Sequence, residues 1–113
     1  TMSNGNVALM MNLARYSGLP WDAILGAEVT GYYKPQPECY LKTAAFLGFK
    51  PEQCMLVAAH NYDLVAASQL GFRTAFVGRP TEYGPHQKQD FKAEHDYDVI
   101  AKDMVDVAIQ LGC

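Results

Sequence analysis

Polar side chains able to do chemistry stand at three points of the sequence, each between an apolar stretch and the start of a predicted helix. They are Ser3 and Asn4 at the first, Lys34 at the second, and His60, Asn61 and Asp63 at the third. A hydroxyl beside the N–H groups at a helix start suits a carboxylate or a phosphate. A lysine ammonium stabilises negative charge or pairs with a nucleophilic carboxylate, and an aspartate can hold that lysine or help to activate water. These residue types therefore predict a site that handles an anion.

Each of these residues also has an ordinary structural interpretation. Ser3 can cap a helix, and Lys34 can be a solvated surface charge. Asp63 can interact favourably with a helix dipole, and His60 can be a polar residue of a turn. Because the polar groups recur at the same place in three successive units, the chemical interpretation is favoured. What is missing is a nucleophile, since no residue of the chain obviously fills that role.

The elements that must position these residues alternate between strands and helices. Helical spacing of apolar residues, with glycines at the predicted ends, indicates helices at about 6–17, 38–47, 64–70 and 103–111. Short apolar stretches indicate strands within 21–29 and at 55–59, 73–77 and 97–101. This order predicts an α/β fold, a Rossmann-like parallel sheet with helices on both faces, within a single domain spanning residues 1–113. The three polar groups would then share one edge of the sheet and converge over one crevice.

Several local expectations follow. Ser3 or Asn4 is expected to cap the first helix. The stretch 55–59 lacks alternation, which is typical of a strand buried on both faces of a parallel sheet. His60 to Asp63 are expected to form a polar elbow before the helix at 64, and residues 81–95 a surface loop.

Composition and charge limit the possible partners and compartments. Half of the 113 residues are hydrophobic, 19% are charged and the net charge is −3, so neither nucleic acid nor a membrane is expected as a partner. No apolar run approaches the roughly 20 residues of a membrane helix, and no signal peptide is visible. The three widely spaced cysteines are expected to be reduced thiols in a cytoplasmic protein. Without a glycine-rich phosphate fingerprint, no nucleotide cofactor is implied.

The candidate residues resemble an ordered set of motifs of a known superfamily. The set is Ser3-Asn4-Gly5, then Lys34-Pro35, then an apolar strand followed by Asp63. It is similar to motifs II, III and IV of the haloacid dehalogenase (HAD) superfamily. Within that superfamily the chain resembles the type II (S)-2-haloacid dehalogenases, because Tyr40, six residues after Lys34, matches their active-site tyrosine. The likeness extends over essentially the whole chain.

The resemblance implies a hydrolytic reaction without a cofactor. A strand-end aspartate attacks the α-carbon of an (S)-2-haloacid and displaces halide, and water then hydrolyses the resulting ester to give the (R)-2-hydroxyacid. Ser3 and Asn4 would hold the substrate carboxylate, Lys34 would lie beside the nucleophile, and Asp63 would support Lys34 and the hydrolytic water. The nucleophile belongs to a DxxxT-like motif I upstream of a helical cap, and the chain contains neither. We therefore expect a C-terminal core segment of a longer enzyme, inactive by itself and, as is common in the family, part of a homodimer.

The chain departs from the family pattern just before Asp63. Where such dehalogenases often have Ser-Ser-Asn, this chain has Ala58-Ala59-His60, and a histidine there can bind or activate water or merely fill the space. Metal-dependent HAD phosphatases usually read GDxxxD, which places Ala59 at a metal-ligand position where a hard cation needs oxygen. This favours a metal-independent dehalogenase. The alternatives are a HAD phosphatase with an eroded metal site and a non-catalytic HAD-like binding domain.

Overall fold

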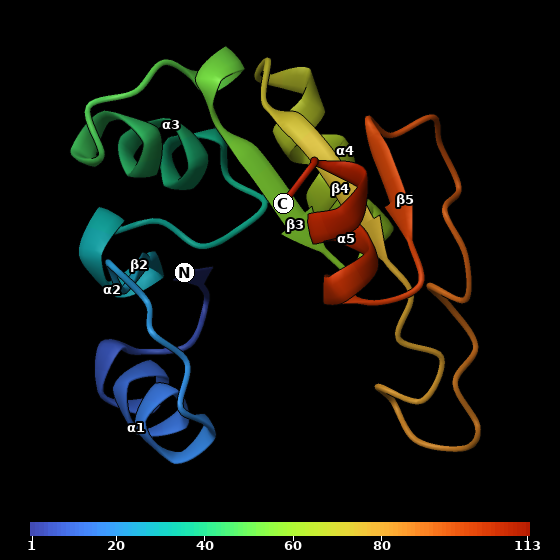
Figure 1. Ribbon diagram of the computed structural model, residues 1–113. Helices are drawn as coiled ribbons and strands as arrows, with labels where there is room; N and C mark the ends of the chain where they lie inside the picture. The colour runs from blue at the N-terminus through green and yellow to red at the C-terminus, as the bar shows by residue number, and fades with distance from the viewer. The chain divides into compact units, whose positions relative to one another are not determined.

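The structure, a computed structural model, describes residues 1–113 and contains two compact units, Thr1–Lys50 and Pro51–Cys113 (Figure 1). Each unit combines parallel strands with helices, which confirms the predicted α/β class. None of the helices has the length and apolar composition needed to span a membrane.

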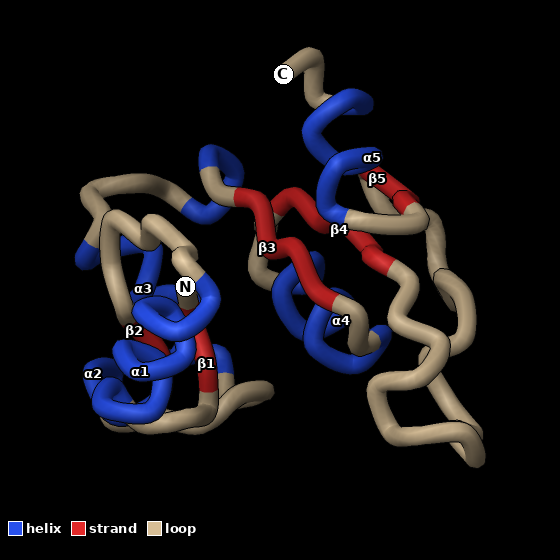
Figure 2. Tube along the Cα trace, turned by 60° about the horizontal axis from the view of Figure 1, so that its bottom comes forward, coloured by secondary structure: helices blue, strands red, loops and turns tan.

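The first unit is built on a pair of short parallel strands (Figure 2). Its elements are β1 (Met2–Ser3), α1 (Val7–Ser17), β2 (Leu25–Gly26), α2 (Ala27–Thr30) and α3 (Pro37–Phe46). Strand β1 pairs with β2 in parallel, with Ser3 opposite Gly26. Pro37 begins α3, where its fixed φ and missing N–H cost nothing. Gly18 ends α1 in the left-handed conformation, as predicted.

One expectation for the first unit was wrong, and the short strand expected within 21–29 is present. The cap of α1 is Asn6 rather than Ser3 or Asn4, because the Asn6 side chain accepts a hydrogen bond from the N–H of Leu9. The apolar stretch after Trp21 forms a strand of two residues only, and the chain then turns into α2. The reason is Gly26, whose φ of 127° ends the extended conformation.

The second unit is a three-stranded parallel sheet in the order β3-β4-β5. Its elements are the 3-10 turn η1 (Pro51–Gln53), β3 (Met55–Ala58), α4 (Asn61–Gln69), β4 (Arg73–Val77), β5 (Val99–Ala101) and α5 (Met104–Gln110). Figures 1 and 2 show α4 on one face of this sheet and α5 on the other. The prediction for β4 matches the structure, and Asp103 caps α5 by accepting from the N–H of Asp106.

The core of the second unit lies mainly around its middle strand. Ala75 and Val77 of β4 are buried against Val99, Ala101 and Val107. Strand β3 differs from its prediction, because all four of its residues are only half-buried. It is an edge strand of the sheet, with β4 on one side.

The start of α4 and the end of the 81–95 loop also differ from expectation. Helix α4 begins at Asn61 rather than at residue 64, so Asn61, Tyr62 and Asp63 form its first turn. Of the predicted elbow, only His60 lies outside the helix. Residues 81–95 form no helix or strand, as predicted, and β5 begins at Val99 rather than at residue 97.

Candidate active site

Asn4 and Lys34, two candidate residues of the first unit, meet through the backbone of Lys34. The side-chain Oδ1 of Asn4 accepts from the N–H of Lys34 at 2.8 Å, and its Nδ2 donates to the carbonyl of Lys34 at 3.2 Å. The side-chain amide of Asn4 thus binds both the N–H and the carbonyl of Lys34, a residue 30 positions away. This pair of hydrogen bonds is called the Asn4 clamp below. Asn4 therefore positions Lys34 as well as being a candidate ligand-binding residue.

Ser3 is fixed by its neighbours at the end of β1. Its Oγ accepts a hydrogen bond from the N–H of Gly5 at 3.0 Å. Its backbone lies against Gly26, where an added Cβ would be 2.0 Å from the carbonyl oxygen of Ser3. The close pairing of β1 with β2 therefore requires glycine at position 26, and this pairing fixes the position of Ser3.

The N–H groups at the start of α1 are less available to an anion than the sequence indicated. The N–H of Val7 donates to Oε2 of Glu28 at 2.7 Å, and the N–H of Leu9 donates to Oδ1 of Asn6 at 2.8 Å. A carboxylate at a helix start is favourable, and here the chain supplies its own. The N–H groups of Val7 and Leu9 therefore do not form the anion site expected at this helix start, because side chains of the protein already bind them.

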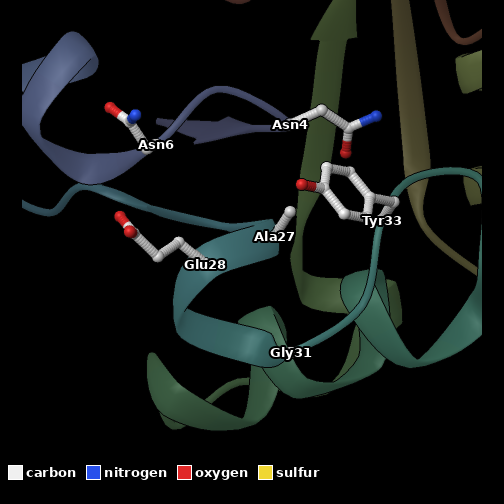
Figure 3. A pocket seen from close by; sticks show the side chains of 6 residues that line it. All are labelled: Asn4, Asn6, Ala27, Glu28, Gly31 and Tyr33. Atoms are coloured by element: carbon white, nitrogen blue, oxygen red, sulfur yellow. The ribbon is translucent and has the colours of Figure 1, made fainter.

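An open depression of about 440 Å³ lies beside the Asn4 clamp. It is lined by polar and small residues of the first unit: Asn4, Asn6, Ala27, Glu28, Gly31 and Tyr33. Figure 3 shows Asn6 and Glu28 at one end of this depression and Asn4 and Tyr33 at the other. The side chain of Tyr33 is largely exposed, so this end is open to a small molecule from solvent.

Tyr40 lies in the first turn of α3 and is completely buried. Cys39 and Ala44 of the same helix are also buried, so Tyr40 belongs to the core of the first unit. The Tyr40 hydroxyl is therefore not accessible from solvent in this structure.

The candidate residues of the second unit flank the start of α4. His60 is the residue before the helix, and Asp63 is in its first turn with 2% of its surface exposed. Burial raises the pKa of the intervening Tyr62 hydroxyl, and the nearby Asp63 carboxylate raises it further. Tyr62 is thus neutral at neutral pH.

Asn61 is the centre of a hydrogen-bond network that ties the 81–95 loop to α4. Its backbone N–H and its Nδ2 both donate to Oδ1 of Asp90, each at 2.9 Å. Its Nδ2 also donates to the carbonyl of Lys92 at 3.1 Å, while its Oδ1 accepts from the N–H of Glu94 at 3.0 Å and from the hydroxyl of Tyr97 at 2.9 Å. Asp90 therefore caps α4 from a distant part of the chain, in place of the missing side-chain cap from His60.

His60 has partners in the same loop. Its Nε2 lies 3.1 Å from Oε2 of Glu82, and its ring lies nearly parallel to the rings of Tyr62 and Tyr83. Sequence reasoning missed Glu82, Tyr83 and Asp90, because they lie in a polar stretch that resembles any surface loop. The sequence carries no signal that pairs them with residues more than 20 positions away.

Comparison with known proteins identifies the class to which this arrangement belongs. The family model for a haloacid dehalogenase-like hydrolase matches residues 1–71, and the chain belongs to that family. This region contains all the candidate residues predicted from the sequence.

Particular relatives are similar over much or all of the chain. The crystal structure of the L-2-haloacid dehalogenase PA0810 superposes with a TM-score of 0.94 and 55% identity, covering 96% of this chain and 47% of that one. The (S)-2-haloacid dehalogenase 4A of Burkholderia cepacia is 29% identical over 114 aligned positions, 95% of this chain and 49% of that protein. A phosphoglycolate phosphatase of Aquifex aeolicus is 35% identical over 68 positions, 60% of this chain and 30% of that protein. The chain thus spans about half the length of the two dehalogenases.

Proposed function

We propose that the whole protein carrying this chain hydrolyses the carbon–halogen bond of small (S)-2-haloacids and releases (R)-2-hydroxyacids. The observation that carries the proposal is the 55% identity, over 96% of the chain, to a protein described as an L-2-haloacid dehalogenase. The Asn4 clamp supports it, because it gives Lys34 a fixed backbone position beside a half-buried serine.

The proposed roles follow the order of the motifs. Ser3 and the remaining amide hydrogen of Asn4 bind the substrate carboxylate. Lys34 stabilises the charge of a nucleophilic aspartate and of the departing groups, and Asp63 supports the hydrolytic water. Tyr40 is the last proposed active-site residue, at the position of the tyrosine of the type II dehalogenases that the chain resembles. The nucleophile is expected in motif I, which these 113 residues do not contain, so the activity is proposed for a protein in which that motif accompanies them.

The second candidate is phosphate-ester hydrolysis, which the similarity to a phosphoglycolate phosphatase favours. Against it stands Ala59, whose methyl group offers no oxygen to a divalent cation at the position where metal-dependent relatives carry an aspartate. We therefore rank the metal-independent dehalogenase first.

Halide release and phosphatase activity can be measured side by side. The whole protein is incubated with (S)-2-chloropropionate or with p-nitrophenyl phosphate, each with EDTA and with Mg²⁺. We expect chloride release that EDTA does not reduce. Phosphatase activity that requires Mg²⁺, with no chloride release, would overturn the proposal in favour of the second candidate.

Lys34→Ala tests the central residue of the proposed site. It should abolish turnover in a protein that still folds, as cooperative urea unfolding would show, because the hydrogen bonds from Asn4 to the backbone of residue 34 remain. The matched control is Lys88→Ala, an exposed lysine of the 81–95 loop, which should retain full activity. Retained turnover in Lys34→Ala would remove Lys34 from the site.

A further inference from the structure

His60 and Glu82 form an imidazole–carboxylate pair that the proposed roles leave unused. Nε2 of His60 and Oε2 of Glu82 are 3.1 Å apart, and the two side chains are 26% and 20% exposed. The other oxygen of Glu82 is 3.4 Å from Nη1 of Arg79. The pair is thus partly shielded but reachable by water.

The imidazole is held in orientation by aromatic rings. The ring centroids of Tyr62 and Tyr83 are each 5.8 Å from that of His60, at interplanar angles of 10° and 23°. Glu82 and Tyr83 are neighbours in the sequence, so one segment of the 81–95 loop supplies both the carboxylate and a ring partner. Asn61, the residue after His60, ties the same loop to α4. The loop therefore fixes the histidine from several directions.

The second ring nitrogen is left for chemistry. A carboxylate accepts hydrogen bonds, so Glu82 favours the tautomer with the proton on Nε2 and the lone pair on Nδ1. His60 occupies the cap position of α4, yet its side chain makes no hydrogen bond to the N–H groups of the helix. Nδ1 of His60 therefore does not accept a hydrogen bond from the N–H groups at the start of α4. A basic nitrogen oriented through its partner nitrogen by a carboxylate is the arrangement of a general base.

We propose that His60 is the general base that hydrolyses the ester intermediate, and that Glu82 is its positioning residue; this assignment rests on the proposed dehalogenase function. His60 follows the carboxyl end of β3 and stands three residues before Asp63. The neighbouring Ala58 has no polar side-chain atom with which to orient water.

Nδ1 of His60 takes a proton from water while the water oxygen bonds to the carbonyl carbon of the aspartyl ester. The bond between that carbon and the ester oxygen then breaks, and the imidazolium returns its proton to the departing alkoxide, which leaves as the 2-hydroxyacid. The aspartic acid that remains loses its proton to solvent and is regenerated as carboxylate.

The test separates formation of the ester from its hydrolysis. In the whole protein, His60→Gln keeps an amide donor for Glu82 but has no basic nitrogen. With (S)-2-chloropropionate we expect it to release about one equivalent of chloride per protein and then stall, as an enzyme does when a covalent intermediate accumulates. Intact-protein mass spectrometry should show the added propionate ester. Ester hydrolysis should fall by about 100-fold or more, the usual contribution of a general base.

Two further variants complete the experiment. Glu82→Gln should show the same chloride burst with a smaller loss of ester hydrolysis, and it keeps the test usable where His60→Gln does not fold. His86→Asn, an exposed histidine of the same loop, should behave as wild type.

The outcomes distinguish the two proposals. Wild-type rates of ester hydrolysis in His60→Gln would overturn the role of His60. Loss of the first equivalent of chloride and of the ester adduct would overturn it too, because His60 would then act before the ester exists. A wild-type protein that releases no chloride would instead overturn the dehalogenase function itself, and the role of His60 with it.

Discussion

Replacing Asn61 by alanine should cost the protein about 3 kcal/mol of folding free energy, because its side chain joins α4 to the 81–95 loop. The truncation removes four side-chain hydrogen bonds, two donated by Nδ2 and two accepted by Oδ1. The bond from the backbone N–H of residue 61 to Asp90 remains. Asn61 is 4% exposed and Asp90 is 8% exposed, so water replaces their lost contact poorly.

The four bonds do not contribute equally. Lys92 and Glu94 are exposed, so water can satisfy their backbone groups after the truncation. The bond from Nδ2 to the Asp90 carboxylate is buried and worth about 2 kcal/mol, and the bond from the Tyr97 hydroxyl is worth about 1 kcal/mol. Their sum gives the expected cost.

Urea unfolding measured by circular dichroism supplies the test, with Asn12→Ala as the matched control. Asn12 is exposed in the middle of α1, so its truncation should change the unfolding free energy by no more than about 0.5 kcal/mol. Hydrogen exchange should also show faster exchange of the 81–95 amides in Asn61→Ala. A cost as small as that of the control would refute the reasoning, since it would mean that the network contributes nothing net.

Two further predictions concern a glycine and a carboxylate. Gly26→Ala should prevent folding or cost several kcal/mol more than Gly31→Ala in urea unfolding. A Cβ at position 26 would lie 2.0 Å from the carbonyl oxygen of Ser3, whereas a Cβ at position 31 meets no neighbouring atom and only the positive φ of 80° is unfavourable, by about 1–2 kcal/mol. Equal costs would contradict the steric argument. The N–H of Thr74 holds the pKa of Asp98 below its usual value, so the carboxylate stabilises the fold above about pH 4 and loses this effect as pH falls through the lowered pKa. The difference in unfolding free energy between wild type and Asp98→Asn should therefore be largest at neutral pH and shrink as pH falls through the lowered pKa; a difference independent of pH would show that the ionised form is not responsible.

Elements whose causes lie in adjacent residues were predictable from the sequence. Pro37 at the start of α3, Gly18 at the end of α1 and Asp103 at the start of α5 act within one helical turn, so the local sequence is sufficient. The strand Arg73–Val77 is rich in apolar and β-branched residues and lies between Gly71 and Gly78, which makes it recognisable from the local sequence.

Elements that depend on distant partners were not predictable. Helix α4 starts three residues early because Asp90, 29 positions along the chain, bonds the first N–H of the helix. Asp90 reaches it with a φ of 56°, an unusual conformation for a residue other than glycine. In the candidate site, His60 is a candidate because of its position in the sequence, but its partner Glu82 lies in a loop with no regular pattern. The Asn4 clamp was likewise missed, because a hydrogen bond to backbone is compatible with any residue at position 34.

In the Asn4 clamp, one residue fixes the position of the backbone and the other carries the charged side chain. Asn4 bonds the backbone of residue 34, so these two hydrogen bonds are available to any residue there except proline, which has no N–H. At position 4, by contrast, few side chains offer one acceptor and one donor at this spacing. Substitutions at 34 therefore alter the charge that is presented, whereas substitutions at 4 alter where that charge is carried. The two kinds of defect can be separated by experiment.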